Sequence, residues 1–191
     1  TLNEDQIVEG FRLSYGTGYV LNTQNAASTR NTGLEITADA NFYNTKSFGW
    51  NLKLNFNKMW NKVIQMPPNV SEYYNAYTWV NGARNGISIN NPTTTITSTG
   101  YLRNDKGDVL ISPLNGLPVI DGLYKVRGDR NPDFTLGILN SFRLNNWKLS
   151  FLFDLKMGGD IYNGTEYFLA RNGRSKITAD RLTPRVIEGV L

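Results

Sequence analysis

The residues that could carry chemistry in this chain are carboxylates, amides and aromatic rings, because the sequence contains no Cys and no His. Their absence excludes thiolate nucleophiles, disulfides, Cys/His zinc sites and the usual histidine general base. Glu35 and Asp39 fall on one predicted strand and Asp154 on another, and the sequence alone gives no geometry that would pair two of them for acid–base catalysis. We therefore expect no catalytic residue, cofactor or resident metal, and we do not expect an enzyme.

Three acidic loop segments admit a functional and a structural interpretation. Asp105 and Asp108 could supply oxygens to calcium, but two carboxylates are too few, which favours a solvated turn. Residues 129–133 also indicate a turn, with Pro132 where a strand begins. Gly158-Gly159-Asp160 is either a loop that contacts a ligand or partner, together with Tyr162, or a glycine turn whose aspartate bonds backbone N–H groups. The turn preference of Asp favours the second interpretation.

A cluster of aromatic side chains lies in a long polar loop. Such rings could stack on sugars or pack against a partner protein, since Tyr and Trp are enriched at interfaces. Packing within the loop itself is the alternative, and we favour it slightly. The members of the cluster are Tyr73, Tyr74, Tyr77 and Trp79.

The elements that must position these residues are strands with alternating apolar and polar side chains, a period that places the two kinds on opposite faces. The clearest is a hairpin over residues 133–157, whose two-residue turn is Asn145-Asn146. Only short helical patterns compete, the best of them at 166–171. The alternating segments are 11–21, 33–43, 50–62, 133–144 and 147–157. The third loses its phase near Lys58-Met59, either at a bulge or where the strand leaves apolar surroundings.

Connection lengths favour a membrane barrel over a soluble sheet. Residues 44–49 and 145–146 are short, whereas 22–32, 64–131 and 158–191 are long and polar. Short periplasmic turns with long extracellular loops are typical of outer-membrane barrels. The alternation of direction then requires that 64–131 contain zero or two further barrel strands, with candidates near 86–99 and 101–112. Trp50, Trp147 and Tyr43 flank the short turns, where aromatic girdles meet the lipid interface.

Charge and hydropathy exclude other classes of protein. The net charge is +4, and its 20 basic residues are scattered rather than clustered, so no nucleic-acid partner is expected. No stretch of 18 apolar residues predicts a transmembrane helix. The first and last residues look like cuts inside a longer protein, with no signal peptide at the start.

Two motifs carry a resemblance to a known family. Gly128-Asp129-Arg130-Asn131-Pro132-Asp133-Phe134 precedes the hairpin, and Gly158-Gly159-Asp160-Ile161-Tyr162-Asn163 follows it. With Asn31-Thr32-Gly33-Leu34-Glu35 upstream, the set resembles the SusC/RagA group of TonB-dependent outer-membrane transporters. The resemblance is weakest over 66–100.

The resemblance implies an all-β fold in which residues 1–191 form one piece of a transmembrane barrel domain of about 22 strands. The plug domain and the final strands would lie outside this chain. It further implies a non-enzymatic importer in the outer membrane of a Gram-negative, Bacteroidetes-like bacterium. The implied partners are a SusD-like surface lipoprotein, TonB acting through the plug, membrane lipid, and oligosaccharide or peptide cargo.

The alternative is a soluble all-β carbohydrate-binding module, in which the apolar faces pack together as a sandwich. The two hypotheses differ in where the apolar side chains of 147–157 point. Packing of Leu149, Phe151, Phe153 and Leu155 against a second sheet of this chain would exclude the barrel.

Overall fold

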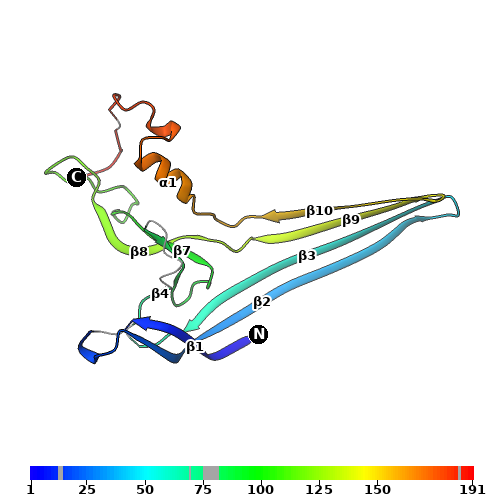
Figure 1. The fold of residues 1–191 in the computed structure, drawn as a ribbon, viewed down its shortest axis with the longest axis horizontal. Helices are drawn as coiled ribbons and strands as arrows, with labels where there is room; N and C mark the ends of the chain where they lie inside the picture. The colour runs from blue at the N-terminus through cyan, green and yellow to red at the C-terminus, as the bar shows by residue number, and fades with distance from the viewer. Residues whose placement is uncertain (13–14, 69, 75–81, 185) are drawn as a thin grey trace.

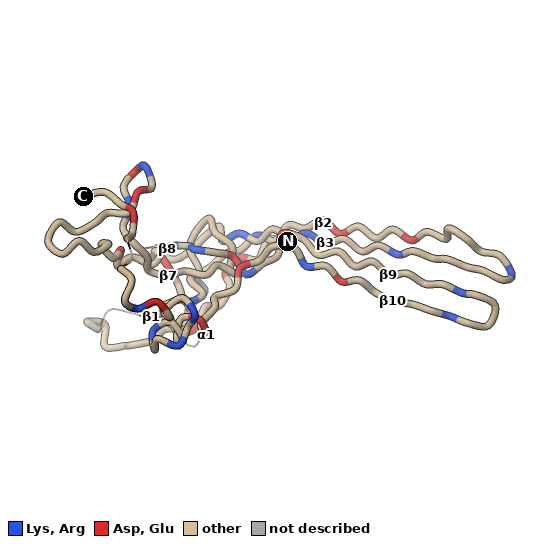
Figure 2. The backbone as a smooth tube through the Cα atoms, turned by 90° about the horizontal axis from the view of Figure 1, so that it is seen from above, with Lys and Arg blue, Asp and Glu red and all other residues tan. Residues whose placement is uncertain are grey.

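The chain folds into a long arm of antiparallel strands that ends in a smaller loop region (Figure 1). The computed structural model describes residues 1–12, 15–68, 70–74, 82–184 and 186–191. Its main sheet has five strands in the order β1-β2-β3-β9-β10. They are β1 (Leu2–Arg12), β2 (Leu21–Asn44), β3 (Phe48–Gln65), β9 (Phe134–Leu144) and β10 (Trp147–Met157). Four of them, β2, β3, β9 and β10, run side by side along the arm (Figure 2).

Both short turns lie at the far tip of the arm, as the alternation of strand direction predicted (Figure 1). Asn145 adopts φ 50° in the β9–β10 turn, a conformation that Asn tolerates better than most residues. Its N–H donates to the carbonyl of Ser47 at 2.7 Å. The Arg143 guanidinium donates to the carbonyls of Thr45 and Lys46 at 2.6 and 2.9 Å. These bonds join the two turns into one unit.

The register keeps apolar side chains in continuous rows across the sheet. Ala38, Leu54, Ile138 and Phe153 stand opposite one another along one row. The adjacent row, displaced by one residue, is Thr37, Asn55, Gly137 and Asp154. A slip of one residue would exchange the two faces, so the whole apolar face specifies this register.

Residues 66–133 contribute no strand to the main sheet, because β3 pairs directly with β9 from Phe48–Leu144 to Asn57–Thr135. Of the two alternatives for this segment, zero or two barrel strands, the described residues show zero. The intervening segment forms two small sheets near the base of the arm. They contain β4 (Tyr73–Tyr74) with β6 (Gly86–Ile87), and β5 (Ala83–Arg84) with β7 (Thr95–Tyr101) and β8 (Ile120–Asp129).

The turn predicted around Asp105 and Asp108 is confirmed. Asn104 donates its N–H to the Asp108 carbonyl at 3.1 Å, and Gly107 adopts φ 91°. The Asn104 side chain accepts the N–H groups of Lys106 and Asp108 and donates to the Asp108 carboxylate. These contacts make 104–108 a self-contained turn.

The prediction of a strand over 11–21 is wrong, as is that of a loop over 22–32. β1 ends at Arg12, a 3-10 turn, η1 (Tyr15–Thr17), follows, and Gly18 adopts φ 78°. That left-handed conformation interrupts extended backbone and suits glycine. β2 begins at Leu21 and pairs with β1 through residues 21–30. The strand around Lys58-Met59 has no bulge against β2. Its pairing with β9 stops just before Lys58, at the pair Asn57–Thr135.

The expected helix at 166–171 is present as α1 (Gly164–Arg171). Asn163 caps it, because its side-chain oxygen accepts the Glu166 N–H at 2.9 Å. A 3-10 turn, η3 (Lys176–Thr178), follows it. No helix among the described residues is both long and apolar enough to cross a membrane.

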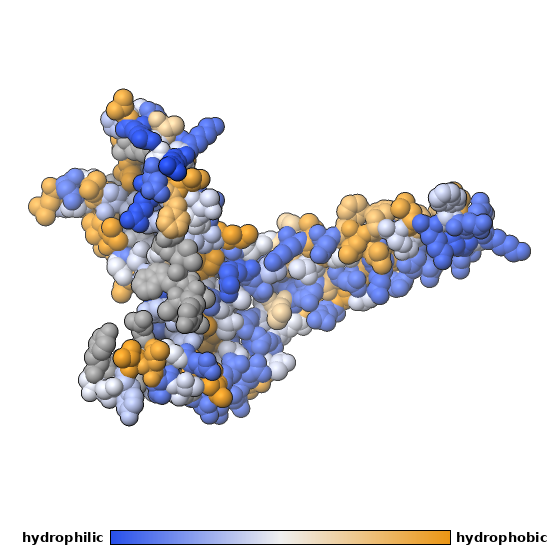
Figure 3. Space-filling model, viewed as in Figure 1, coloured by the Kyte–Doolittle hydropathy of each residue, from blue (hydrophilic) through white to orange (hydrophobic). Residues whose placement is uncertain are grey.

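Very little apolar surface is buried inside the chain. Among the described residues the buried hydrophobic side chains are Val63, Ala83 and Val109. In Figure 3 apolar side chains lie along the arm, and the tip around the short turns is hydrophilic. The arm therefore has no core of its own on its apolar face.

Candidate functional site

The two motifs that flank the β9–β10 hairpin meet at its base and bond to each other. Asp160 donates its N–H to the Asp129 carbonyl at 2.6 Å, and its carboxylate accepts the Asp129 N–H at 2.8 Å. Asp133 donates its N–H to the carbonyl of Met157 at 2.8 Å. The two predicted turns thus form one structure, which we call the rim clasp (residues 128–133 and 157–160).

The rim clasp also holds the start of β7. One oxygen of the Asp129 carboxylate accepts the Asn131 N–H at 3.0 Å and the Thr94 hydroxyl at 2.5 Å. The Arg130 N–H donates to the Thr94 carbonyl at 3.1 Å. These bonds connect the β5-β7-β8 sheet, through Thr94, to the base of the arm.

Glycine is required at the clasp for two different reasons. Gly158 and Gly159 adopt φ 72° and 84°, a region that side chains with a Cβ rarely occupy. Gly128 allows the Asp160 carboxylate to approach the backbone, because a Cβ at this position would lie only 2.6 Å from that carboxylate. The favoured interpretation of Asp160 as a residue that bonds backbone N–H groups agrees with this geometry, although its partner belongs to the other motif.

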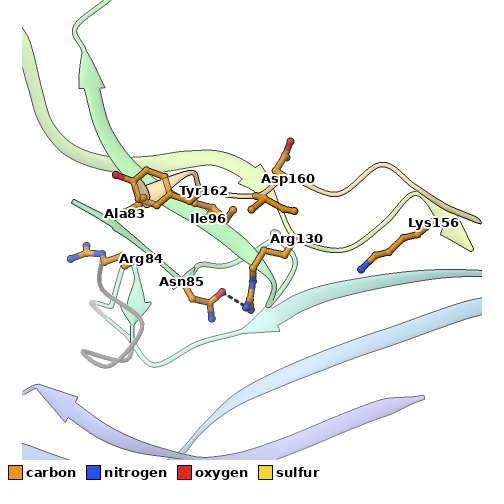
Figure 4. Close-up of a pocket in the computed structure, with 10 residues that line it drawn as sticks. Ala83, Arg84, Asn85, Ile96, Arg130, Lys156, Asp160 and Tyr162 are labelled. Carbon is orange, nitrogen blue, oxygen red and sulfur yellow. Dashed lines mark hydrogen bonds between the residues drawn. The ribbon is translucent and has the colours of Figure 1, made fainter. Parts of the chain in front are cut away.

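A groove of about 430 Å³ opens beside the clasp, between the loop sheets, β10 and the segment that leads to α1 (Figure 4). We call it the rim groove. Three cationic side chains and one carboxylate line it, together with a tyrosine and apolar residues. They include Arg84, Arg130, Lys156, Asp160, Tyr162, Ala83, Ile96 and Ile161. Burial raises the pKa of the Tyr162 hydroxyl, and Tyr167 nearby adds to the effect.

The Arg84 guanidinium is fully engaged in packing the wall of the groove. Its guanidinium pairs with the Glu72 carboxylate, which also accepts the Thr97 hydroxyl at 2.6 Å. It lies between the rings of Tyr74 and Tyr124, with centroids 3.7 and 3.5 Å away. Cation–π contacts on both sides strengthen the packing of this largely buried cation.

The predicted aromatic cluster is placed only in part. Tyr74 packs on Arg84, and Tyr73 donates its hydroxyl to the Glu9 carbonyl at 2.7 Å. Burial raises the pKa of Tyr73, with a smaller contribution from the Glu9 charge. The contact of Tyr74 with Arg84 lies within the loop, as the favoured interpretation predicts, whereas Tyr73 bonds outside the loop, to β1. Tyr77 and Trp79 lie outside the described residues.

Two of the three residues predicted for an aromatic girdle, Tyr43 and Trp50, come together near the tip. Between Asn41–Asn51 and Tyr43–Trp50 the register shifts, which leaves Phe42 as an extra residue in β2. Trp50 stacks on Phe42 and Tyr43, with centroids 4.6 and 6.3 Å apart. The bulge therefore brings Tyr43 beside Trp50. Trp147 is 81% exposed at the start of β10.

The polar face of the arm combines amides and hydroxyls with charged side chains of both signs. Asn51 donates to the carboxylate of Asp39 at 2.6 Å and to the side chain of Asn41 at 3.1 Å. Thr37 donates to Asn55 at 3.1 Å. No two carboxylates bond each other here, and the described residues contain no metal-binding group of three acidic residues.

Sequence reasoning missed the rim groove and one polar residue on the apolar face. Asn140 interrupts the alternation of β9 and accepts a hydrogen bond from the Trp50 indole at 3.3 Å. That interruption was visible in the sequence. The groove was not, because Arg84, Arg130 and Lys156 come from segments far apart in the chain.

The chain is thus an all-β protein whose sheets are antiparallel and open, with β1 and β10 as the edges of the larger one. Such a sheet, with one apolar face, short turns at one end and loops at the other, resembles a fragment of a transporter barrel. No family model matches the sequence.

Comparison with known proteins narrows the class. Over 183 residues the chain is 26% identical to TonB-dependent receptor P3 of Formosa agariphila, covering 82% of this chain and 18% of that protein. The RagAB peptide transporter has the same fold over 87% of this chain and 19% of the solved one, with 21% identity and a TM-score of 0.59. The RagAB peptide importer in its closed-closed state gives 17% identity and 0.58. The chain therefore resembles part of a TonB-dependent receptor and shares its fold with part of RagA, the resemblance that its motifs predicted.

The chain spans about a fifth of the length of these relatives. Their names describe a receptor and a peptide transporter.

Proposed function

We propose that the chain forms wall strands and extracellular loops of an outer-membrane importer of the SusC/RagA type. The importer lies in the outer membrane of a Gram-negative bacterium of the Bacteroidetes kind. Residues 1–191 are one piece of its barrel domain, and the plug and final strands are in other parts of the protein. The importer takes up peptides or oligosaccharides beneath a SusD-like lipoprotein, with energy supplied by TonB acting on the plug.

The observation that carries this proposal is the exposed apolar face of the arm. From the girdle to the row of Ile36, Phe56, Leu136 and Leu155, its side chains include no charged residue on β2, β3, β9 or β10, and Lys58 is the first, one row closer to the clasp. The ten-residue pairing of β3 with β9 matches the roughly 9–11 residues that a tilted barrel strand needs to cross a bilayer. Lipid would cover this face, and the polar face would line the interior.

The exposure of β10 argues against the soluble carbohydrate-binding module. Leu149 and Phe153 are each 61% exposed, and no second sheet of the described chain covers them. A sandwich would bury these side chains between its sheets. The proposal also gives Trp50, Trp147 and Tyr43 their place at the lipid interface on the periplasmic side.

The test is uptake by the native bacterium. Deletion of the complete transporter gene should abolish the import of at least one isotopically labelled peptide or oligosaccharide, and disruption of TonB should give the same loss. Restoring the gene should restore import. Unchanged import of a broad panel in both mutants would refute the proposal.

A further inference from the structure

We propose that the rim groove binds a carboxylate group of the cargo, with Arg130 and Lys156 as its binding residues. The inference rests on the proposed function, because it assigns a chemical property to the molecule that is imported. It adds that the cargo is recognised through a negative charge beside an apolar portion.

The charge balance of the groove favours an anion. Glu72 neutralises Arg84, which lies locked between two tyrosine rings. The Asp160 carboxylate is turned to the Asp129 N–H, which it accepts at 2.8 Å. Arg130 and Lys156 are the two remaining cations of the lining, and no described carboxylate forms an ion pair with either of them.

Two hydrogen bonds position the Arg130 side chain and leave other N–H donors of its guanidinium unused. Its Nε donates to the Thr94 carbonyl and its Nη2 to the Asn85 side chain, both at 3.4 Å. A guanidinium has five N–H donors, so these long contacts use fewer than half of them. Figure 4 shows the amino group of Lys156 extending towards the Arg130 side of the groove. A planar guanidinium with an ammonium nearby suits an oxyanion.

The rest of the lining indicates what accompanies the anionic group. Ala83 and Ile96 line the groove with Arg130, and Ile161, which is 92% exposed, lies at the opening. These apolar side chains indicate that the bound group carries aliphatic or ring carbon next to its charge. The end of a peptide and an acidic sugar both have this chemistry.

The groove also lies where a passing cargo would meet it. Lys156 stands on the polar face of the sheet, in the row that contains Thr135 and Asn57. The clasp fixes the other side of the groove through Arg130. A molecule that enters from the loop end and moves along the polar face therefore contacts both cations first.

The experiment measures binding and uptake by the full-length transporter for two matched pairs of probes. One pair is N-acetyl-trileucine and its C-terminal amide, and the other is trigalacturonate and its methyl ester. Within each pair a neutral amide or ester replaces the charged carboxylate while the rest of the molecule is unchanged. The variants are Arg130→Gln, Lys156→Gln and the charge-conserving Arg130→Lys. Lys106→Gln, in the separate 104–108 turn, removes the same charge outside the groove and is the matched control.

We expect the charged member of one pair to bind more tightly, and that pair identifies the source of the carboxylate. Each Gln variant should weaken its binding about two- to fivefold, the value of an exposed ion pair, and should reduce its dependence on salt. Arg130→Lys and Lys106→Gln should retain most of the preference.

Two results would overturn the inference. Equal binding of both members of each pair, or a charge preference that survives both Gln variants, would refute it while leaving the proposed function intact. Failure of the transporter to import any of the four probes or any other peptide or oligosaccharide would refute the proposed function, and the inference with it.

Discussion

A single lysine can test whether the apolar face of the arm contacts lipid. Ile138 lies in the middle of β9, between Leu54 and Phe153 in the apolar row. Its neighbour Gly137 lies in the polar row, between Asn55 and Asp154. The variants Ile138→Lys and Gly137→Lys therefore place the same charge one residue apart on opposite faces.

The two variants should differ strongly in stability. A lysine at the bilayer midplane of a barrel costs about 2–4 kcal/mol, which corresponds to a factor of about 30–900 in the folding equilibrium. A Cβ at Gly137 meets its nearest atom, in the Leu152 side chain, at 3.7 Å, so the control has room for its side chain. Lysine there also stands opposite Asp154, and we expect a change within about 0.5 kcal/mol.

The assay is urea denaturation of the full-length protein in phospholipid vesicles, followed by the shift in gel mobility between folded and unfolded forms. Abundance in isolated outer membranes gives a second readout. Similar midpoints for the two variants would refute the lipid-facing assignment, because a face in contact with water would tolerate lysine at either position.

Three further predictions concern the clasp, the girdle and the loop sheet. Asp160→Ala removes the acceptor of the Asp129 N–H, and trypsin should cleave the intact transporter faster within 125–130, with unchanged cleavage elsewhere as the contrast. Trp50→Phe removes the indole donor to Asn140 and should destabilise by about 0.5–1.5 kcal/mol, whereas adding Asn140→Leu should recover most of this loss. The contact with Lys125, at 2.6 Å, lowers the pKa of Asp121 below its ordinary value of 3.8. Because the folded value is the lower one, the stabilisation is complete above about pH 4 and is lost as the pH falls through the folded pKa. Hydrogen exchange of the β7–β8 sheet should accelerate in acid in the native protein but not in Asp121→Asn.

Strands with two unlike faces could be predicted from the sequence, and strands with two similar faces could not. The alternation from Trp147 to Met157 predicted β10 from end to end, because one face is uniformly apolar. Nearly half of β2 was mistaken for a loop, since residues 22–32 are mostly polar on both faces and carry no period. Pairing with β1 stabilises that segment, and such pairing leaves no local signal.

The same distinction applies to the candidate site. The glycines at 158 and 159 and the turn-forming Asp160 were evident, because left-handed backbone has a local requirement. The bond from Asp129 to Asp160 spans 31 residues and depends on the register of the β9–β10 hairpin. Likewise, the stacking of Arg84 on Tyr74 and Tyr124 joins strands of two separate sheets, so no motif of fixed spacing could reveal it.

The direct pairing of β3 with β9 has a consequence for how such a chain can vary. Asn57 and Thr135 are neighbours in the sheet, and the whole of β4 to β8 is contained in the loop between them. The entropy of closing a loop grows only with the logarithm of its length, by about 0.6 kcal/mol per doubling. The stability of the β3–β9 pairing therefore depends only weakly on the length of the chain inserted between these strands. Residues 66–133 can lengthen, shorten or be exchanged while the strands beneath them keep their register.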